Sequence, residues 1–550
     1  MNLSVKILGI CFTLGLLFIP ILSQAQNDTN YRSYSEITSS MKALNNAHKN
    51  ITALKSVAKT KGGKDVWVLT IGSGDVKNHP GIAVIGGAKA SHVFGSELTL
   101  KFAEQLLSTA NTEETKALLA STTFYVFPQI NPDASVQYFS NLKYERDGNT
   151  TSTDADRDGL YDEDGFEDLN GDNLITMMRV EDQTGNWMPY KHDARVMVKA
   201  DASKGEKGSY MLFTEGRDND KDGEFNEDGE GGVNINQNFS YDFPYFKPGS
   251  SENPVSENET RGVLDFLFEE ARNTFAVVSF GPENNLSDPL KFNKGAASKR
   301  VVSGWLSEDV AVNKMISELY NEKTNLGKAP SRDPQQGDLF QWAYYHYGSY
   351  SFSTPGWWTP EVNGEDGKAK KFDNEHAKHL AWAEMENQDV FVEWTEIDHP
   401  DFPNQKVEVG DFKPFTMMTP PLEIIDSLAQ SHTDFIVELA LKKPSVQLVN
   451  FKSEKAGKNL TRIMVDVYNE GSFPTASELG QRNNWVRRVM TQIKLDNNMS
   501  LISGDVQDFD RSIPADGSVN KTWLIQGSGK VTITSGSPMT GFATKEQTIK

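Results

Sequence analysis

Short apolar segments that alternate with helix-like segments constrain the fold of this chain more than any other feature. Residues 66–70, 82–85 and 123–127 are apolar runs rich in β-branched and aromatic side chains, which is typical of strands buried on both faces. Between the last two runs, residues 96–107 place leucine and phenylalanine at helical spacing. The alternation resumes after residue 233 and continues to about residue 441. This order of elements predicts an α/β fold around a sheet.

The composition changes abruptly at two places along the chain. Residues 146–230 are rich in Asp, Glu, Gly and Asn and contain few apolar residues to build a core, so they predict an acidic insertion that adds no layer to the sheet. Residues 445–550 consist of strand-length segments separated by turn residues, which is typical of a β-sandwich. Because 550 residues exceed what one core supports, we expect an α/β domain over residues 26–441, carrying the insertion, and a C-terminal β-sandwich domain.

The first 25 residues have the pattern of a secretory signal. Lys6 precedes an apolar stretch from Ile7 to about Leu22, and a small-x-small sequence ending at Ala25 follows it. A membrane anchor is the competing interpretation, but the stretch is shorter than the ~20 apolar residues that cross a bilayer. We expect cleavage near Ala25 and a secreted or periplasmic mature protein. The single cysteine, Cys11, lies inside the signal, so we expect no disulfide in the mature chain.

The net charge of −21 excludes some classes of partner. Cleavage of the signal would remove one lysine and no acidic residue, which brings the net charge to about −22. Such a surface repels a phosphate backbone, so we expect no nucleic-acid partner. No later apolar run reaches the length of a membrane-spanning helix, and we expect no membrane insertion.

One segment carries a family motif. Residues 86–98, with the sequence GGAKASHVFGSEL, follow a strand-like run and open a helix-like one. The segment resembles the first active-site segment of the carboxypeptidase A-like zinc peptidases, whose pattern is Gly-x-x-His-x-x-Glu at the end of a strand. Three further segments resemble motifs of the same family, in the family's order: 131–134 (NPDA), 234–239 (NINQNF) and 256–260 (SENET). The resemblance covers roughly residues 40–420 and implies a carboxypeptidase-like mixed sheet flanked by helices.

The resemblance also implies where the metal and the catalytic base belong. In the family, zinc is held by a His and a Glu of the first segment and by a second His after a later strand, and water takes the fourth position. Aligning the glycines puts Lys89 and His92 at the first two ligand positions. The third ligand falls on Phe280 or Gly281, and the general base, a Glu in the family, falls on Pro355. An ammonium group has no lone pair for a metal, and proline has no proton to exchange.

The substrate-binding positions are changed as well. Segment 234–239 resembles the family's Asp-x-Asn-Arg-Asn-Phe, whose Arg clamps the C-terminal carboxylate of the substrate, so Asn236 and Gln237 are candidate substrate-binding residues. Gln237 can donate a hydrogen bond but carries no charge. Arg146 is the candidate for the family's carbonyl-polarising Arg.

These substitutions favour a catalytically inactive pseudopeptidase that binds a peptide, cell-wall or glycan partner in the former cleft and does not bind zinc. In this interpretation His92 is a satisfied polar residue at a helix start. One alternative is an active zinc metallocarboxypeptidase whose metal is held by displaced ligands such as His92, Glu97 or Glu283. Another is a structural module whose cleft is closed by Phe280 and a tryptophan of the pair at 357–358.

Three stretches of the acidic insertion repeat one spacing, with oxygen-bearing side chains at positions one, three and five. Alternate oxygens on a tight loop converge on Ca²⁺, a hard ion that takes roughly six to eight such ligands. None has Glu at position twelve, so the stretches are not standard EF-hands and resemble the calcium loops of dockerin-type repeats. The alternative is a solvated acidic loop. We predict calcium binding, and the candidate ligands are Asp154, Asp156, Asp158, Asp168, Asn170, Asp172, Asp218, Asp220 and Asp222.

Overall fold

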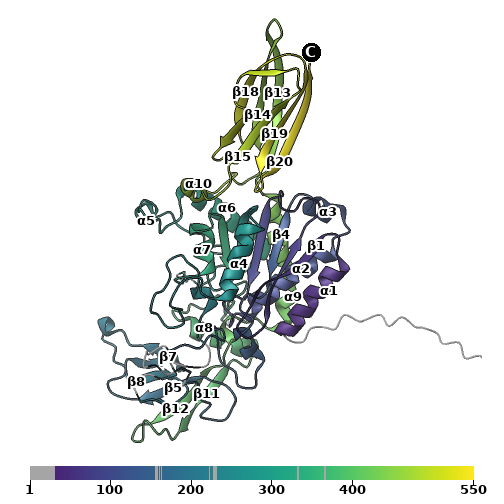
Figure 1. The fold of residues 1–550 in the computed structure, drawn as a ribbon. Coiled ribbons are helices and arrows are strands. Elements are labelled where there is room, and N and C mark those ends of the chain that lie inside the picture. Colours follow the sequence, from purple (N-terminus) through teal and green to yellow (C-terminus); the bar gives the residue numbers. More distant parts are fainter. Residues whose placement is uncertain are drawn as a thin grey trace, which may run out of the picture.

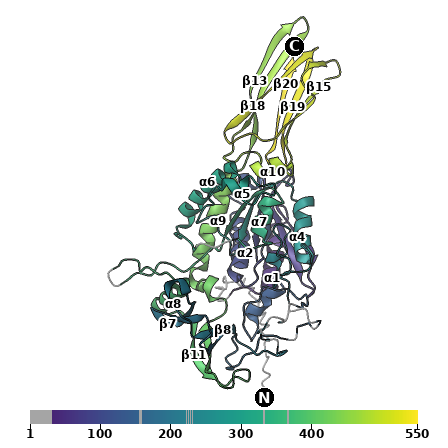
Figure 2. The ribbon, with the colours of Figure 1, turned by 90° about the vertical axis from the view of Figure 1, so that its left-hand side faces the viewer.

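The computed structural model describes residues 31–550 except 155–158, 160, 163, 222, 224, 227–228, 230–231, 331–333 and 365–366. Three bodies follow one another along the long axis of the molecule: a central α/β body, a β-sandwich at one end and a smaller β-sheet at the other (Figure 1). The view turned by 90° shows the same linear arrangement (Figure 2). The signal predicted over residues 1–25 lies outside the described residues. Among the residues that are described, no helix has the length and apolar character needed to cross a membrane.

A six-stranded mixed sheet forms the centre of the α/β body, in the order β1-β2-β4-β3-β9-β10. Strands β4, β3, β9 and β10 run parallel, whereas β2 is antiparallel to both β1 and β4. Every residue of the four parallel strands is buried, which explains the continuous apolar runs in β3, β4 and β9. The strands are β1 (Thr52–Lys59), β2 (Asp65–Ile71), β3 (Gly81–Gly86), β4 (Thr123–Phe127), β9 (Thr274–Phe280) and β10 (Tyr350–Thr354).

Helices cover both faces of this sheet. Alternate strand residues point to opposite faces, so Val84 of β3 packs in the core under α1, α2, α6 and α9, and Ala83 packs in the core under α4 and α7. The fold predicted from the sequence, a mixed sheet flanked by helices, is confirmed. The helices are α1 (Tyr34–Ala47), α2 (Val93–Ser108), α3 (Glu113–Leu119), α4 (Asn258–Glu269), α5 (Lys294–Ala297), α6 (Ser307–Thr324), α7 (Leu339–Tyr345), α8 (Glu375–Met385) and α9 (Ile425–Leu441).

The acidic insertion contains strands in addition to loops. Four of its strands join two strands from a distant part of the chain in the order β11-β12-β5-β8-β6-β7, here called the insertion sheet. The sequence predicts too few apolar residues for a core because the insertion alone does not contain them all. Val407 and Val409 of β12, from the distant segment, pack with Met178 and Val180 of β5. The strands are β5 (Met177–Glu181), β6 (Trp187–Tyr190), β7 (Asp193–Lys199), β8 (Tyr210–Thr214), β11 (Phe391–Ile397) and β12 (Val407–Phe412).

The C-terminal region is an all-β sandwich of two four-stranded sheets, as predicted. The sheet orders are β13-β14-β18-β16 and β17-β15-β19-β20. Inward-facing residues of both sheets, such as Ile463, Trp523 and Ile533, form its core. The strands are β13 (Val446–Gly457), β14 (Leu460–Asn469), β15 (Val489–Leu495), β16 (Ser500–Ser503), β17 (Gln507–Asp510), β18 (Gly517–Gln526), β19 (Gly529–Ser537) and β20 (Gly541–Ile549).

The sandwich is attached at the amino ends of β9 and β10. The buried ring of Phe473 packs edge-on against Phe275 and Tyr350, with ring centroids 5.3 and 5.1 Å apart. The short helix α10 (Glu478–Asn483) lies at the same junction, where the Ser477 hydroxyl donates to the carbonyl oxygen of Gly348 at 2.6 Å. The parallel strands run away from this junction, so their carboxyl ends lie at the edge that faces the insertion sheet (Figure 1).

Candidate functional site

The carboxyl ends of β3, β9 and β10 bring together the residues that the sequence marks as a site. Gly86 of β3 pairs with Phe280 of β9, and Phe280 pairs with Thr354 of β10. Ligands of α/β sheets bind outside the carboxyl ends of parallel strands, because the loops that follow the strands meet there. The segment 87–92, Gly281 and Pro355 therefore share one edge of the sheet.

Lys89 is held in an ion pair at this edge. Its Nζ atom lies 2.5 Å from Oδ2 of Asp147, and Oδ1 of Asp147 accepts a hydrogen bond from the backbone N–H of Ser91 at 2.9 Å. The side chains of Lys89 and Asp147 are 17% and 19% exposed. Burial opposes both charges, but the Asp147 carboxylate raises the pKa of Lys89, and the Lys89 ammonium lowers the pKa of Asp147. Position 89 is thus positively charged at neutral pH and has no lone pair for a metal.

His92 immediately precedes helix α2 and is fully buried. Its Nε2 atom lies 3.0 Å from the carbonyl oxygen of Pro355. A carbonyl oxygen only accepts hydrogen bonds, so Nε2 carries the proton and has no lone pair for a metal. The close approach of these segments requires Gly95, where an added Cβ would stand 2.7 Å from the Phe280 carbonyl oxygen and 2.8 Å from His92 Nδ1. The histidine therefore links the end of β10 to the start of α2.

Phe280, Gly281 and Pro355 connect neighbouring strands. The Phe280 ring is buried in the core, where its centroid lies 5.6 Å from that of the His432 ring. The backbone N–H of Gly281 donates to the carbonyl oxygen of Thr354 at 3.1 Å. Pro355 supplies only the carbonyl group that accepts from His92. None of the three offers a side chain that binds a metal or transfers a proton.

Asn236 and Glu283 lie close to a buried carboxylate, Asp338, that is not among the candidates from the sequence. Asn236 donates from Nδ2 to Oε1 of Glu283 at 3.0 Å, and its Oδ1 accepts from the backbone N–H of Leu339 at 3.3 Å. Asp338 is fully buried and caps α7 by accepting from the backbone N–H of Gln341 at 2.6 Å. Burial raises the pKa of Asp338 well above its usual value, and the nearby Glu283 raises it further. The Asp-x-x-Gln spacing is the sequence signal that identifies Asp338 as a helix cap.

The remaining substrate-binding candidates have local surroundings. The Oε1 atom of Gln237 is buried and accepts no hydrogen bond from the described residues. Arg146 donates from Nε to the carbonyl oxygen of Gly148 at 2.9 Å and from Nη2 to the carbonyl oxygen of Asn149 at 3.0 Å. The guanidinium group therefore stabilises its own loop.

Comparison with known proteins gives the family. Residues 37–175 match the zinc carboxypeptidase family. Residues 37–175 therefore carry a carboxypeptidase A-like domain of this family. Residues 445–548, which form most of the sandwich, match a domain of unknown function (DUF8731).

The similarity to individual carboxypeptidases is partial. Carboxypeptidase M of Mus musculus is 29% identical over 138 residues, which make up 23% of this chain and 30% of that protein. A zinc carboxypeptidase of Saccharothrix mutabilis subsp. capreolus is 26% identical over 144 residues, 24% of this chain and 33% of that protein. The chain thus spans about a third of the length of these curated relatives. Among solved structures, thrombin activatable fibrinolysis inhibitor is 12% identical with a TM-score of 0.43, covering 75% of this chain and 74% of that chain.

The residues at the zinc positions of this carboxypeptidase-like domain do not fit a zinc ion. Lys89 has no lone pair, and the position of the third ligand has no donor atom. His92 keeps a lone pair on Nδ1, but this atom is buried against Gly95. The displaced ligands considered above are engaged elsewhere, because Glu97 accepts from Arg32 at 2.6–3.2 Å and Glu283 accepts from Asn236. Within the described part of the chain, no three His, Cys, Asp or Glu side chains are grouped closely enough to hold a metal.

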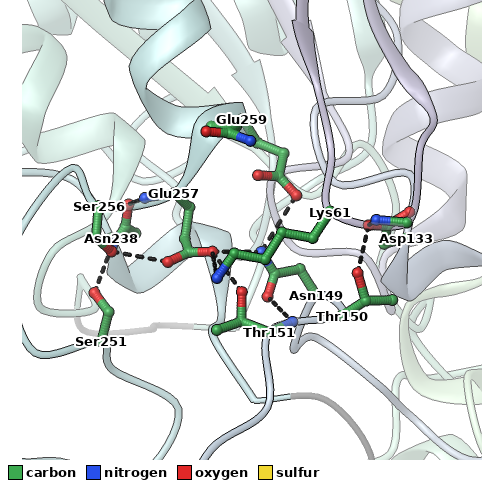
Figure 3. Close-up of polar contacts among 12 residues, drawn as sticks. Lys61, Asp133, Asn149, Thr150, Thr151, Asn238, Ser251, Ser256, Glu257 and Glu259 are labelled. Carbon is green, nitrogen blue, oxygen red and sulfur yellow. Dashed lines mark hydrogen bonds and ion pairs between the residues drawn. The ribbon is translucent and has the colours of Figure 1, made fainter.

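Other motifs of the carboxypeptidase family meet in one polar network (Figure 3). Asn149 donates from Nδ2 to Glu257 at 2.9 Å and to Glu259 at 3.2 Å. The backbone N–H of Glu257 donates to Oδ1 of Asn238 at 3.2 Å, and Asp133 accepts from the Thr150 hydroxyl at 2.9 Å. Burial raises the pKa of Glu259, whereas hydrogen bonds, chiefly from Thr151, lower that of Glu257 in spite of burial. The network joins the motifs at 131–134, 234–239 and 256–260 to the start of the insertion.

The three candidate calcium loops of the insertion share one backbone contact. The first carboxylate of each loop accepts a hydrogen bond from the backbone N–H of the sixth residue, at 3.2 Å for Asp154, 2.8 Å for Asp168 and 3.2 Å for Asp218. The sixth residues, Gly159, Asn173 and Gly223, have φ angles of 98°, 65° and 100°, which suit glycine and asparagine. Asn170, Asp172 and Asp220 lie in the described part, whereas Asp156, Asp158 and Asp222 lie outside it.

Proposed function

We propose that this chain is a catalytically inactive member of the zinc carboxypeptidase family that binds a peptide, cell-wall or glycan partner at the edge formed by β3, β9 and β10. The observation that carries the proposal is the ion pair between Lys89 and Asp147 at the position of the family's first zinc ligand. A fixed ammonium group repels a divalent cation and cannot activate a water molecule as zinc does. The same edge retains hydrogen-bonding groups, among them Asn236 and Glu283.

The polar groups at this edge also indicate what kind of ligand it selects. A carboxypeptidase recognises a free C-terminus through a guanidinium group that pairs with the carboxylate at two points. Gln237 offers only an amide at this position, so it gives no electrostatic preference for a terminal carboxylate. We therefore expect recognition through amide and hydroxyl groups, which are common to peptides and glycans.

Metal analysis and activity together test the proposal. The purified mature protein should contain less than stoichiometric zinc and should not hydrolyse peptides with a free C-terminus. A peptide in its C-terminal acid and amide forms should bind with similar affinity, and Gln237→Ala should weaken both forms equally. Stoichiometric zinc with chelator-sensitive turnover would favour the alternative, an active zinc metallocarboxypeptidase with displaced ligands.

The burial of aromatic residues around the site supports a further candidate, a purely structural module. Phe280, Trp357 and Trp358 belong to the same buried cluster. A module of this kind binds neither peptides nor glycans, so failure of a panel of peptides and peptidoglycan fragments to bind would favour it.

We also propose calcium for the insertion and a location outside the cytoplasm. The calcium proposal is supported by the repeated contact between the first carboxylate and the sixth N–H in three loops. A ligand that binds only the native state raises stability, so EDTA should lower the melting temperature of the protein and added calcium should restore it. Amino-terminal sequencing of the secreted protein should begin near residue 26, in agreement with the predicted signal.

A further inference from the structure

A cavity lies between the α/β body and the sandwich, at the opposite end of the parallel strands from Lys89. Its volume is about 590 Å³, and residues of both bodies line it, among them Phe292, Ser298, Arg482 and Arg511. Figure 1 shows α5, α6 and α10 together at this junction. The backbone N–H of Glu478, at the start of α10, donates to Oδ1 of Asp309 in α6 at 2.8 Å. This hydrogen bond holds α10, on the sandwich side of the cavity, against α6 of the α/β body. The cavity is therefore a separate site from the one described above.

Cationic side chains outnumber acidic ones among the residues that line this cavity, although the chain as a whole carries a net charge of −21. Two cationic side chains, Arg482 and Arg511, line it, together with one acidic side chain, Glu478. The Glu478 carboxylate already accepts from the backbone N–H of Glu308 at 3.0 Å. Further cations stand beside the lining residues in the sequence, on the segments 291–300 and 482–488. The cationic residues of the two segments and the cavity are Lys291, Lys294, Lys299, Arg300, Arg482, Arg487, Arg488 and Arg511.

These cations have no acidic partner among the described residues. All of them are exposed, and none forms an ion pair within that part of the chain. Arg482 donates from Nη1 to the carbonyl oxygen of Ala297 at 3.3 Å, which orients the side chain at the cavity wall and leaves its charge uncompensated. In a chain with an excess of carboxylates, a local group of uncompensated cations favours binding of an anionic ligand.

The uncharged lining indicates the rest of the ligand. Phe292 is 47% exposed at the cavity and offers an aromatic face to an apolar surface of the ligand. Ser298, Ser307 and Gln481 supply neutral groups that donate and accept hydrogen bonds. A sugar ring has both an apolar C–H face and hydroxyl groups, and a volume of this size accepts a short oligosaccharide. We propose that this cavity binds an acidic polysaccharide, with sugar carboxylate or sulfate groups paired to Arg482 and Arg511.

Two other polyanions fit the structure less well. An anionic membrane is bound by a flat face with apolar anchors, whereas Arg482 and Arg511 line an open, concave pocket. Proteins that bind single-stranded nucleic acids stack successive bases on several aromatic side chains, whereas Phe292 is the one aromatic residue among the described residues that line this cavity. Segment 291–300 carries four further cations next to the lining residues Phe292 and Ser298 in the chain, which suits a polymer that carries a charge on successive sugars.

Titration calorimetry at low and moderate salt tests the proposal. The probes are a galacturonic acid hexamer, a heparin-derived hexasaccharide and a neutral galactose hexamer. We expect one or both acidic probes to bind, with an affinity that falls as salt is added, and the neutral probe not to bind. Arg482→Ala/Arg511→Ala should weaken binding at least about tenfold, because each arginine contributes a charged hydrogen bond. Arg482→Lys/Arg511→Lys should retain part of the affinity, because lysine keeps the charge but not the planar fork.

The matched control is Lys455→Ala/Lys458→Ala, which removes the same charge from the far tip of the β13–β14 hairpin. This control should change the affinity less than about twofold, and melting curves should show that both double variants fold. The proposal is overturned if neither acidic probe binds, if the neutral probe binds equally well, or if the hairpin variant loses as much affinity as the arginine variant. Binding to phosphatidylglycerol vesicles without binding to the acidic probes would also overturn it, in favour of a membrane surface.

Discussion

The ion pair between Lys89 and Asp147 makes a quantitative prediction about stability. The two side chains are less than one-fifth exposed. The energetic contribution of this pair should therefore be intermediate. Removing one partner of a fully buried pair costs ~3–5 kcal/mol, whereas a surface pair contributes ~0–1 kcal/mol. We expect Asp147→Asn to lower the free energy of unfolding by about 2–3 kcal/mol, because Lys89 keeps a largely buried charge that has lost its partner. Lys89→Met should cost about 1–2 kcal/mol, since Asp147 retains its hydrogen bond from Ser91.

The double variant separates pairing from other effects. Lys89→Met/Asp147→Asn should cost less than the two single changes added together, with a coupling of about 1–2 kcal/mol. Urea unfolding followed by tryptophan fluorescence measures these values, and Lys116→Met is a matched control, since it breaks an exposed pair with Glu113 and should cost about 0–0.5 kcal/mol.

The same pair predicts a pH profile. The pKa of Asp147 is lowered by folding, so its contribution is present at neutral pH and is lost as the pH falls through the folded-state pKa. The pKa of Lys89 is raised, so its contribution is lost only as the pH rises through the folded-state pKa, above the usual range of lysine. Single variants that each cost less than about 0.5 kcal/mol and add independently would refute the argument that this pair holds the site together.

Three further changes test the surroundings of the site. Gly95→Ala should destabilise the protein by about 1–3 kcal/mol, because the added Cβ would meet the Phe280 carbonyl oxygen at 2.7 Å; an unchanged melting temperature would contradict this. Asp338→Asn should flatten the pH profile. Burial raises the pKa of Asp338, so its contribution is present below pH ~4 and is lost as the pH rises. The wild type should therefore lose more stability than the variant between pH ~4 and ~8. Asn149→Ala should cost about 2–3 kcal/mol, since it removes donors from two buried carboxylates, whereas the same change at the exposed Asn141 should cost less than about 0.5 kcal/mol.

The elements that the sequence predicts well are those with a local signal. Residues 123–127 are apolar without interruption because β4 is buried on both faces, and the segment 86–98 can be aligned because its glycines permit close packing between β3 and α2. The insertion sheet was missed because its core needs Val407 and Val409, which are about 230 residues away from β5 in the chain. Pairings of this kind leave no periodic pattern in either segment alone.

The candidate site also combines residues that have a local signal in the sequence with contacts that only the fold creates. The exchange at Lys89 is visible in the sequence, but its partner Asp147 is not, because a salt bridge across 58 positions has no spacing rule. Asp338 is recognisable as a helix cap, yet only the fold brings it near Glu283. The sequence neighbours of Arg146 make it a candidate substrate-binding residue, but only the structure shows that its guanidinium donates to two carbonyl groups of its own loop.

The position of Phe473 has a consequence for how this protein can be divided in the laboratory. Its ring belongs to the cluster that also contains Phe275 and Tyr350 of the central sheet. Cutting the chain near residue 444 would therefore remove the aromatic side chain that covers the amino ends of β9 and β10 and expose these strand ends to water. The α/β body and the sandwich are therefore best produced as one chain, because a boundary after residue 473 would leave β14 without its partner strand β18.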